Sequence, residues 1–410
     1  MVFFKNRKYA KYLKATPAAI SAVALLVSSG ARASNEPPAL YDARSVAMGG
    51  TGGAYLENGA SVYHNPGALD GIAQGAFTLA LSPSSTVIHS PVAGPNTSVK
   101  SDASVFPLFL VGGAYRVSDR VVLGVAAYPT AGFGSGYSNV AAFGGQSLKF
   151  GIAAFEAAPA ASVKITDQLS IGLAWRFTYV HQSATQPLPP PQGGSLDQTL
   201  NGTSVVGASI GAYWRPSDDL HFGLTYRSKV TATLKGKSTI GGVDYDTSGD
   251  FAASPHTFKA AAAGWLLKHR LMLAIDLKYL LFKEANKEIS LTTDSPAGPQ
   301  TATIPLQWKN VLSLSSGVEV VVHGPFAVRA GYTLSQSATP SETAAYFTPP
   351  PGLLQAVHAG AGAHLAHWDV DVGGAYGFGS ANATPSDPRT NPGKFRFTTL
   401  IGSVSVTYRR

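Results

Sequence analysis

Residues 169–180 have the sequence LSIGLAWRFTYV, in which every second side chain is large and apolar. The apolar face carries Leu169, Ile171, Leu173, Trp175, Phe177 and Tyr179. Ser170, Arg176 and Thr178 lie on the opposite face. This period of two predicts a β-strand with one apolar and one polar face. A soluble sandwich would show the same pattern, so the rest of the chain must decide between fold classes.

The alternation recurs along the chain from about residue 76. In the stretch 220–235 it places Leu220, Phe222, Leu224, Tyr226, Val230, Ala232 and Leu234 on one face. We predict about fourteen strands, at 76–88, 104–117, 121–129, 148–165, 169–184, 200–215, 220–237, 256–268, 271–291, 303–322, 326–336, 353–365, 369–379 and 394–408. An all-β chain is therefore expected.

The connections between these strands alternate in length. Six are tight, at 118–120, 166–168, 215–219, 268–270, 323–325 and 366–368. Seven longer ones lie between them, including 130–147 and 185–199, and are rich in Pro, Gly, Ser and Thr. Short turns on one side and long loops on the other are typical of an outer-membrane β-barrel, with the turns in the periplasm. Aromatic residues toward strand ends, such as Trp175, Tyr213 and Tyr408, predict interfacial girdles.

Composition agrees with a membrane barrel. The 410 residues are 45% hydrophobic and only 13% charged, whereas soluble domains average about 25% charged. No uninterrupted apolar run is long enough for a transmembrane helix. Residues 1–33 are predicted to be a signal peptide, with a basic start, an apolar stretch 18–27 and an A-x-A cleavage site at 31–33. We assign residues 76–410 to the barrel.

The signal peptide also explains the positive charge. The chain has a formal net charge of +8, but residues 1–33 contain six Lys and Arg and no acidic residue. Without them, 25 basic residues face 23 acidic ones, a net charge of +2. Nucleic-acid binding thereby loses its main support. The absence of Cys excludes a disulfide, a thiolate zinc site and a Cys nucleophile.

Residues 43–69, ARSVAMGGTGGAYLENGASVYHNPGAL, have neither a strand nor a helix period. The segment contains six Gly and ends near Asn65, Pro66 and Gly67. A compact, irregular segment before a long β array predicts a plug inside the barrel.

Several motifs together resemble a known family. They lie at 43–51, 65–66, 222–230, 308–310 and 328–332, where the chain reads ARSVAMGGT, NP, FGLTYRSKV, WKN and VRAGY. In this order and spacing, the chain resembles FadL/TodX-type outer-membrane transporters of long-chain fatty acids and hydrophobic compounds. The resemblance implies a fourteen-stranded barrel and a lumenal gating hatch over residues 34–75, anchored at Asn65 and Pro66. It also implies lateral release of the ligand beside a kinked strand. We place the kink at 128–136, where Pro and repeated Gly weaken strand pairing.

This chain departs from the family pattern at two places. Gly67 stands where the family usually has Ala, which predicts a softer hatch because Gly is conformationally permissive. The C-terminus carries two Arg after Tyr408, where barrels commonly end on an aromatic residue read by the assembly machinery. The second departure bears on assembly and leaves the barrel prediction unchanged.

Strand parity selects candidate ligand-binding residues. If the large apolar side chains face lipid, the lumen receives Arg176, Arg227, Lys229, Lys278 and Arg329. A cation in an apolar pocket suits a fatty-acid carboxylate. The alternative is a salt-bridge network that fastens the hatch to the wall. In the long loops, Phe133, Tyr137, Phe143 and Leu188 are candidates for first capture of an apolar ligand, or for packing of the loops themselves.

An enzyme is not expected. Residues 207–211 match G-x-S-x-G, but the motif runs straight through a predicted strand and lacks the strand–turn–helix context that exposes its Ser. His358, His364 and His367 do not form a convincing metal site. We therefore predict no cofactor and no metal.

The predicted function is passive uptake of a hydrophobic molecule, either a long-chain fatty acid or an aromatic hydrocarbon, through a hatch-gated barrel in the bacterial outer membrane. The expected partners are that ligand, outer-membrane lipids with lipopolysaccharide, and the barrel-assembly machinery, and the expected state is a monomer. Alternatives are a structural or adhesive barrel, a non-specific porin, and, less favoured, a barrel lipase or esterase.

Overall fold

The structure is a computed structural model that describes residues 42–187, 194–295, 298–385 and 390–410. The predicted signal peptide and residues 34–41 of the predicted hatch lie outside the described residues. The first strands are β1 (Gly75–Ser90), β2 (Val99–Lys100), β3 (Ser104–Ser118), β4 (Val121–Val140), β5 (Gln146–Lys164), β6 (Leu169–Pro187), β7 (Ser195–Ser217), β8 (Leu220–Arg227), β9 (Val230–Ile240) and β10 (Val243–Ser254). The others are β11 (Thr257–Leu266), β12 (Leu271–Leu280), β13 (Glu288–Ser295), β14 (Gly298–Pro305), β15 (Val311–His323), β16 (Phe326–Ser335), β17 (Leu354–His364), β18 (Trp368–Ala383) and β19 (Gly393–Arg409).

Helical elements are short. They are α2 (Ala43–Ala47), α3 (Ser61–His64), α4 (Phe282–Ala285) and the 3₁₀ turns η2 (Pro66–Gly71), η3 (Ala141–Phe143) and η4 (Ser341–Thr343). Among the described residues, no helix has the length and apolar character needed to cross a bilayer.

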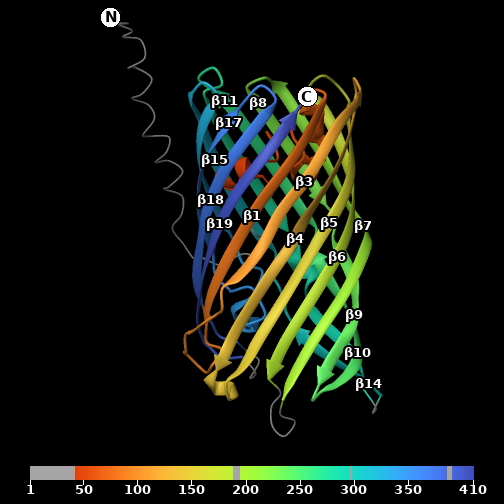
Figure 1. Cartoon of the computed structure of the whole chain (residues 1–410), viewed down its shortest axis with the longest axis vertical. Coiled ribbons are helices and arrows are strands. Elements are labelled where there is room, and N and C mark those ends of the chain that lie inside the picture. Colours follow the sequence, from red (N-terminus) through yellow and green to blue (C-terminus); the bar gives the residue numbers. More distant parts are fainter. Residues whose placement is uncertain (1–41, 188–193, 296–297, 386–389) are drawn as a thin grey trace, which may run out of the picture. The chain divides into compact units, whose positions relative to one another are not determined.

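Fourteen strands form a closed antiparallel ring, which confirms the predicted fold (Figure 1). Their order is β1, β3, β4, β5, β6, β7, β8, β11, β12, β15, β16, β17, β18 and β19. β19 returns to pair with β1 from Ala76↔Arg409 to His89↔Arg396, so no strand edge remains at the seam. Closure is what allows a sheet to span lipid, because every backbone polar group finds a partner in the ring.

The six predicted tight connections all occur, and they lie with the C-terminus at one end of the barrel, which we call the turn end. At the opposite, loop end, the strands continue further than predicted. β4 extends to Val140, and β9 and β10 are joined by only two residues. The predicted long loops 130–147 and 185–199 are therefore mostly strand. The outward residues of these extensions are polar or small, so they show no apolar alternation and were predicted as loops. Their backbone pairing nevertheless continues.

Four wall strands are interrupted at a similar level. The breaks fall between β8 and β9, β10 and β11, β12 and β13, and β14 and β15. At the first break the inward face changes parity: Val230, Ala232 and Leu234 are buried, whereas the sequence pattern had placed them with the exposed Leu224. Two irregular residues, at 228–229, separate the two registers and account for this error.

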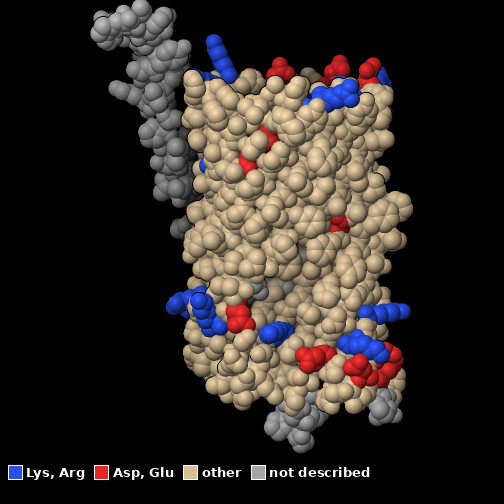
Figure 2. All heavy atoms as spheres, viewed as in Figure 1, with Lys and Arg blue, Asp and Glu red and all other residues tan. Residues whose placement is uncertain are grey.

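The outer surface of the barrel carries a broad band with only isolated charged groups (Figure 2). Within it, large apolar side chains such as Phe77, Leu173 and Leu224 are exposed. Trp175 and Tyr408 also point outward, as predicted for girdles. Tyr213 does not: it is buried and its hydroxyl donates to the backbone of Ala54 at 3.3 Å, inside the barrel.

Candidate functional site

Residues 42–74 pack inside the ring at its turn end, and we call them the lumenal segment. Asp42 caps α2 by accepting hydrogen bonds from the backbone of Arg44 and Ser45 at 2.8 and 3.3 Å. The segment is almost entirely buried. Its backbone touches wall strands so closely that a Cβ on Gly172 or Gly331 would lie 2.2 Å from segment backbone atoms. These wall glycines are therefore required by the close approach of two backbones.

Asn65 joins the lumenal segment to the wall by a side-chain hydrogen bond. Its Nδ2 donates to the backbone oxygens of Gly53 at 2.9 Å and Ala212 at 3.0 Å, and its Oδ1 accepts from the Gly67 backbone at 3.0 Å. The side chain is completely buried. One amide thus links two parts of the segment with strand β7.

Pro66 and Gly67 complete this junction. The Gly67 carbonyl accepts hydrogen bonds from the hydroxyls of Ser162 and Ser170, at 3.0 and 2.9 Å. A Cβ at Gly67 would lie 2.9 Å from the Gly211 carbonyl oxygen and 3.1 Å from the Tyr213 nitrogen. Gly67, which stands where the family usually has Ala, therefore lies at a tight contact between the segment and the wall.

A second polar junction involves the predicted lumenal residue Arg329. Arg329 donates to Glu319 at 2.6 Å and to Asp371 at 2.7 Å, and Arg44 of the lumenal segment reaches the same Glu319 at 2.7 Å. Arg329 and Glu319 are buried. The arrangement corresponds to the predicted alternative of a network that fastens segment to wall.

Glu156 organises the centre of the lumen between two of the predicted cations. Arg176 contacts both of its carboxylate oxygens at 2.5 and 3.0 Å, and Arg227 donates to it at 2.8 Å. Arg176 also donates to the Ser228 carbonyl and the Ser254 hydroxyl, so its donors are well used. Sequence parity did not select Glu156, although a lone acid within the apolar run GIAAFEAAPAA was a signal.

Lys278 is buried on the inward face of β12, as predicted, and Lys259 on neighbouring β11 was missed. Lys259 Nζ lies 3.8 Å from Asp276 Oδ2, which accepts from the Gly53 backbone at 3.2 Å. The Ala-rich strand FKAAAAG shows no apolar alternation, so parity could not place Lys259. Lys229 lies half-buried at the break after β8 and outside the cavity lining described next.

His64 of the lumenal segment faces this positive region. Burial, together with the charges of Lys259, Lys278 and Arg227, lowers the pKa of its imidazole well below the usual 6.5. Both ring nitrogens are buried without a hydrogen-bond partner among the described residues. His64 is therefore neutral while the segment is in place.

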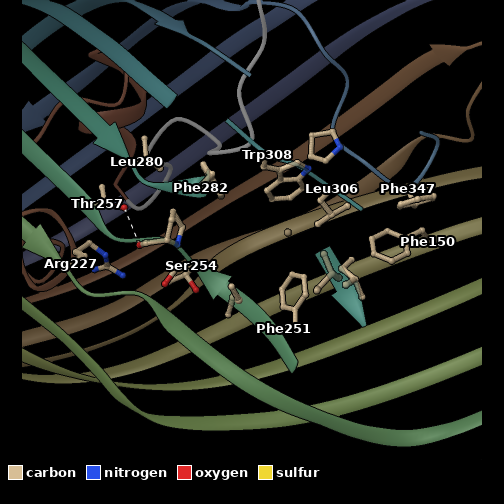
Figure 3. A pocket seen from close by; sticks show the side chains of 18 of the residues that line it. Phe150, Arg227, Phe251, Ser254, Thr257, Leu280, Phe282, Leu306, Trp308 and Phe347 are labelled. Carbon is tan, nitrogen blue, oxygen red and sulfur yellow. Dashed lines mark hydrogen bonds between the residues drawn. The ribbon is translucent and has the colours of Figure 1, made fainter. Parts of the chain in front are cut away.

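An apolar cavity of about 110 Å³ lies between the lumenal segment and the loop end. Its walls come from Tyr63 of the segment, from the strand breaks, and from residues 336–353, which fold into the loop-end mouth and which we call the cap. The lining is mainly aromatic and aliphatic, as Figure 3 shows, and includes Phe150, Ile152, Phe251, Leu280, Phe282, Leu306, Trp308 and Phe347.

Among the described residues that line this cavity, Arg227 is the only charged one. Its guanidinium lies 4.5 Å from the ring centre of Tyr63 and 5.9 Å from that of Tyr128. Among the described residues, Thr130 Oγ1 and Trp308 Nε1 of the lining are buried without a hydrogen-bond partner. Arg227 Nη1 has no carboxylate or carbonyl acceptor there, and the guanidinium lies against the Tyr128 hydroxyl. Buried donors without acceptors are costly, so the cavity is suited to a ligand that supplies an oxygen acceptor.

The barrel wall separates between β3 and β4 beside this cavity. The two strands pair only from Ser118↔Val121 to Val111↔Ala127, although both continue toward the loop end. β4 then shifts register against β5 between Pro129 and Ala131, at the predicted kink. The Phe106 ring of β3 lies where a Cβ on Gly132 would meet it at 2.2 Å, so Gly132 makes room for this ring at the gap.

The predicted capture residues are distributed unevenly. Phe143 lines a small loop-end groove of about 80 Å³ together with Tyr346 of the cap. Tyr137 is buried below that groove and its hydroxyl accepts a hydrogen bond from Ser90 at 2.7 Å. Phe133 lies in β4, and Leu188 lies outside the described residues.

Ser209 and His358, which were considered as candidates for catalysis and for metal binding, both lie in strands of the barrel wall. Ser209 lies within the continuous strand β7, as expected, and is buried. His358 contacts the Val46 carbonyl at 2.7 Å and the Thr333 hydroxyl at 3.0 Å. Within the described ranges, no group of three or more His, Asp or Glu side chains could hold a metal ion.

Comparisons with known proteins agree with this geometry. A family model described as outer membrane protein transport protein (OMPP1/FadL/TodX) matches residues 21–401. The crystal structure of a Pseudomonas aeruginosa FadL homologue superposes with a TM-score of 0.79 at 17% identity, covering 92% of this chain and 100% of that one. The toluene transporter TodX of P. putida gives 0.71 at 15% identity, covering 91% and 99%.

The toluene transporter TbuX of Ralstonia pickettii gives a TM-score of 0.69 at 16% identity, covering 90% of this chain and 98% of that chain. At such identities the structural likeness shows the fold alone. A comparison with curated proteins gives no match.

Proposed function

The chain belongs to the OMPP1/FadL/TodX family of outer membrane transport proteins, and from this premise we propose that it carries fatty acids passively across the outer membrane. Family members are channels for hydrophobic compounds and not enzymes. The turn end then faces the periplasm and the loop end the cell exterior. The proposal concerns the ligand's chemical class, its route and the gating role of the lumenal segment.

The observation that carries the choice of fatty acids is Arg227 at the edge of an otherwise apolar cavity. A carboxylate oxygen would give its Nη1 a charge-assisted hydrogen bond, which is stronger than a neutral one. The nearby lumenal cations Arg176, Arg227, Lys259 and Lys278 outnumber the carboxylates Glu156 and Asp276. An anionic head group reduces this surplus, whereas a neutral hydrocarbon leaves it unchanged.

The size of the cavity supports a route with two parts. Its 110 Å³ compares with the roughly 150 Å³ of an apolar cavity that binds benzene. A longer acyl chain must extend beyond it. Thr130 and Gly132 line the cavity and lie on the part of β4 that has left β3. The chain of a bound acid would lead through this gap toward lipid once the Phe106 ring moves.

The test compares laurate, dodecanol and toluene binding to the purified protein in detergent, with wild type and Arg227→Gln. We expect laurate affinity to fall about tenfold to a hundredfold, because a hydrogen bond to a charged group contributes about 1.5–3 kcal/mol. Dodecanol and toluene should change much less. Lys229→Gln is the matched control, since it removes a neighbouring cation outside the cavity.

Equal laurate affinity in wild type and Arg227→Gln would remove the carboxylate argument. Tight toluene binding without laurate binding would favour a hydrocarbon channel instead. Transport itself is measured as laurate entry into proteoliposomes without an energy source. Rapid passage of glucose through the same vesicles would indicate a non-specific porin.

A further inference from the structure

Basic side chains gather on the outer surface near the loop end, where the uncharged band stops. Lys100 of β2 and Arg396 of β19 both lie opposite His89 of β1, so the three occupy one row across adjacent strands. Neighbouring strands lie about 4.8 Å apart, which places Lys100 and Arg396 about 10 Å from each other along the sheet. Lys394 follows on the same outward face of β19. Figure 2 shows Lys and Arg together with some Asp and Glu at the lower end of the barrel, below the largely uncharged band.

These cations have no acidic partners among the described residues. Lys100, Lys394 and Arg396 are exposed and form no ion pair there. The nearby Asp102 accepts a hydrogen bond from the Ser138 hydroxyl at 2.7 Å.

On the opposite part of the loop end, by contrast, basic and acidic side chains balance one another. On β9 and β10, Lys237 lies 3.0 Å from Asp246, and Asp250 accepts from Thr233 at 2.6 Å. The positive excess is thus local to β2, β1 and β19.

A polar hollow of about 550 Å³ adjoins the basic row. Lys394 and Arg396 form one side, and Asn96, Thr97, Ser98 and Asn382 contribute hydrogen-bonding groups. The hollow is shaped by a backbone contact between the two outer loops, in which Asn96 donates to the Pro392 carbonyl at 2.8 Å. Its volume and mixed polar lining suit a phosphorylated sugar better than a single small ion.

The surface below this hollow is apolar. On the same outward face of β19, Leu400 and Val404 are 63% and 51% exposed. A ligand that places anionic groups on the row and hydrocarbon below it must itself be amphipathic. Among phosphate-bearing molecules, this favours a lipid over a soluble anion or a nucleic acid.

We propose that the row formed by Lys100, Lys394 and Arg396, with the adjoining hollow, binds the phosphorylated sugar head of lipopolysaccharide in the outer leaflet. The cations pair with its phosphates, the polar hollow receives the sugar, and the acyl chains lie along the apolar face of β19. The site is separate from the lumenal cavity and independent of the ligand carried through the barrel.

The experiment measures binding of a fluorescent, phosphorylated rough lipopolysaccharide to the purified mature protein in detergent. The variant is Lys100→Gln/Lys394→Gln/Arg396→Gln, and the matched control is Lys235→Gln/Lys237→Gln on the opposite wall. We expect the triple variant to bind about a hundredfold more weakly, from about fivefold for each cation near an anionic surface. The control should bind like wild type.

Two further ligands separate the sources of phosphate. Dephosphorylated lipopolysaccharide should bind as weakly to wild type as the phosphorylated lipid binds to the triple variant, and millimolar inorganic phosphate should displace little lipid. Equal binding of the dephosphorylated lipid, full displacement by inorganic phosphate, or unchanged binding by the triple variant would each overturn the proposal. Folding is checked by heat-shifted gel migration. If the triple variant does not fold, Arg396→Gln alone must lower affinity about fivefold.

Discussion

Replacing Asn65 with Ala should loosen the lumenal segment while leaving the barrel folded. The substitution removes the contacts to Gly53, Ala212 and Gly67, all of 3.0 Å or less. In the wall, Ala212 stays in register opposite Leu224 and Ile171, and this backbone pairing does not involve the Asn65 side chain. The energetic loss therefore falls on the docking of the segment and not on closure of the ring.

The magnitude follows from the three lost hydrogen bonds. One of them, to Ala212, joins the segment to the wall, and the other two, to Gly53 and Gly67, hold the segment's own fold. At about 1 kcal/mol each, the docked, folded segment loses about 3 kcal/mol relative to the undocked, unfolded one. This corresponds to a population of undocked, unfolded segment that is about 150-fold larger. The buried carbonyls of Gly53 and Ala212 also lose a donor, so the figure is a lower bound.

Hydrogen exchange of peptides within residues 43–69 measures docking directly. We expect exchange about a hundredfold faster in Asn65→Ala, together with larger ion currents in planar bilayers and unchanged heat-shifted migration. Deleting residues 34–67 gives the limiting current. Asn310→Ala is the control, because Asn310 also loses bonds at 3.0 and 3.1 Å, to Lys283 and Tyr279, but lies outside the lumen. Unchanged exchange in a folded Asn65→Ala protein would refute the anchoring role.

Two further outcomes concern the same segment. Gly67→Ala restores the family's usual residue, yet its Cβ would lie 2.9 Å from the Gly211 carbonyl; we expect docking to weaken by about 1–3 kcal/mol, seen as faster exchange of residues 60–70, whereas slower exchange would contradict the steric argument. Since burial lowers the pKa of His64 below 6.5, docking is full above that pH and weakens as the pH falls through it; ion current should therefore rise between pH 7.5 and 5 in wild type but not in His64→Gln, and equal pH profiles would exclude His64 as the cause.

Period-two alternation and connection lengths were sufficient to predict the ring of fourteen strands. They succeed because lipid favours apolar side chains on the outward positions of the spanning part. The extensions of β4, β9 and β10 were not predicted, because outward side chains beyond the bilayer face water and need not be apolar. Backbone pairing continues in these extensions, but it does not require any particular pattern of side chains.

The sequence predicted several of the cations that lie in the lumen. It did not predict which of them pair with acidic residues and which one lines the cavity. Parity placed Arg176, Arg227 and Lys278 inside correctly, since charge on the lipid face is costly. It could not tell Arg176, whose donors are satisfied by Glu156 and Ser254, from Arg227, one of whose donors has no carboxylate or carbonyl acceptor among the described residues. That difference depends on contacts between residues far apart in the sequence.

The residues that line the cavity were even harder to predict from the sequence. It combines Tyr63, the strand breaks and the cap, and none of these carries a periodic signal. The parity change after Arg227 shows the same limit, because two irregular residues reverse the facing of all that follow on the strand.

The aligned breaks in four neighbouring strands have a consequence for how such a protein can change over time. Each break resets the register, so an insertion or deletion on its outer side does not reverse the facing of residues in the bilayer. The outer parts of these four strands can therefore change in length without disturbing their lipid-spanning parts. Because residues at the breaks line the apolar cavity, ligand preference can change there on a constant base.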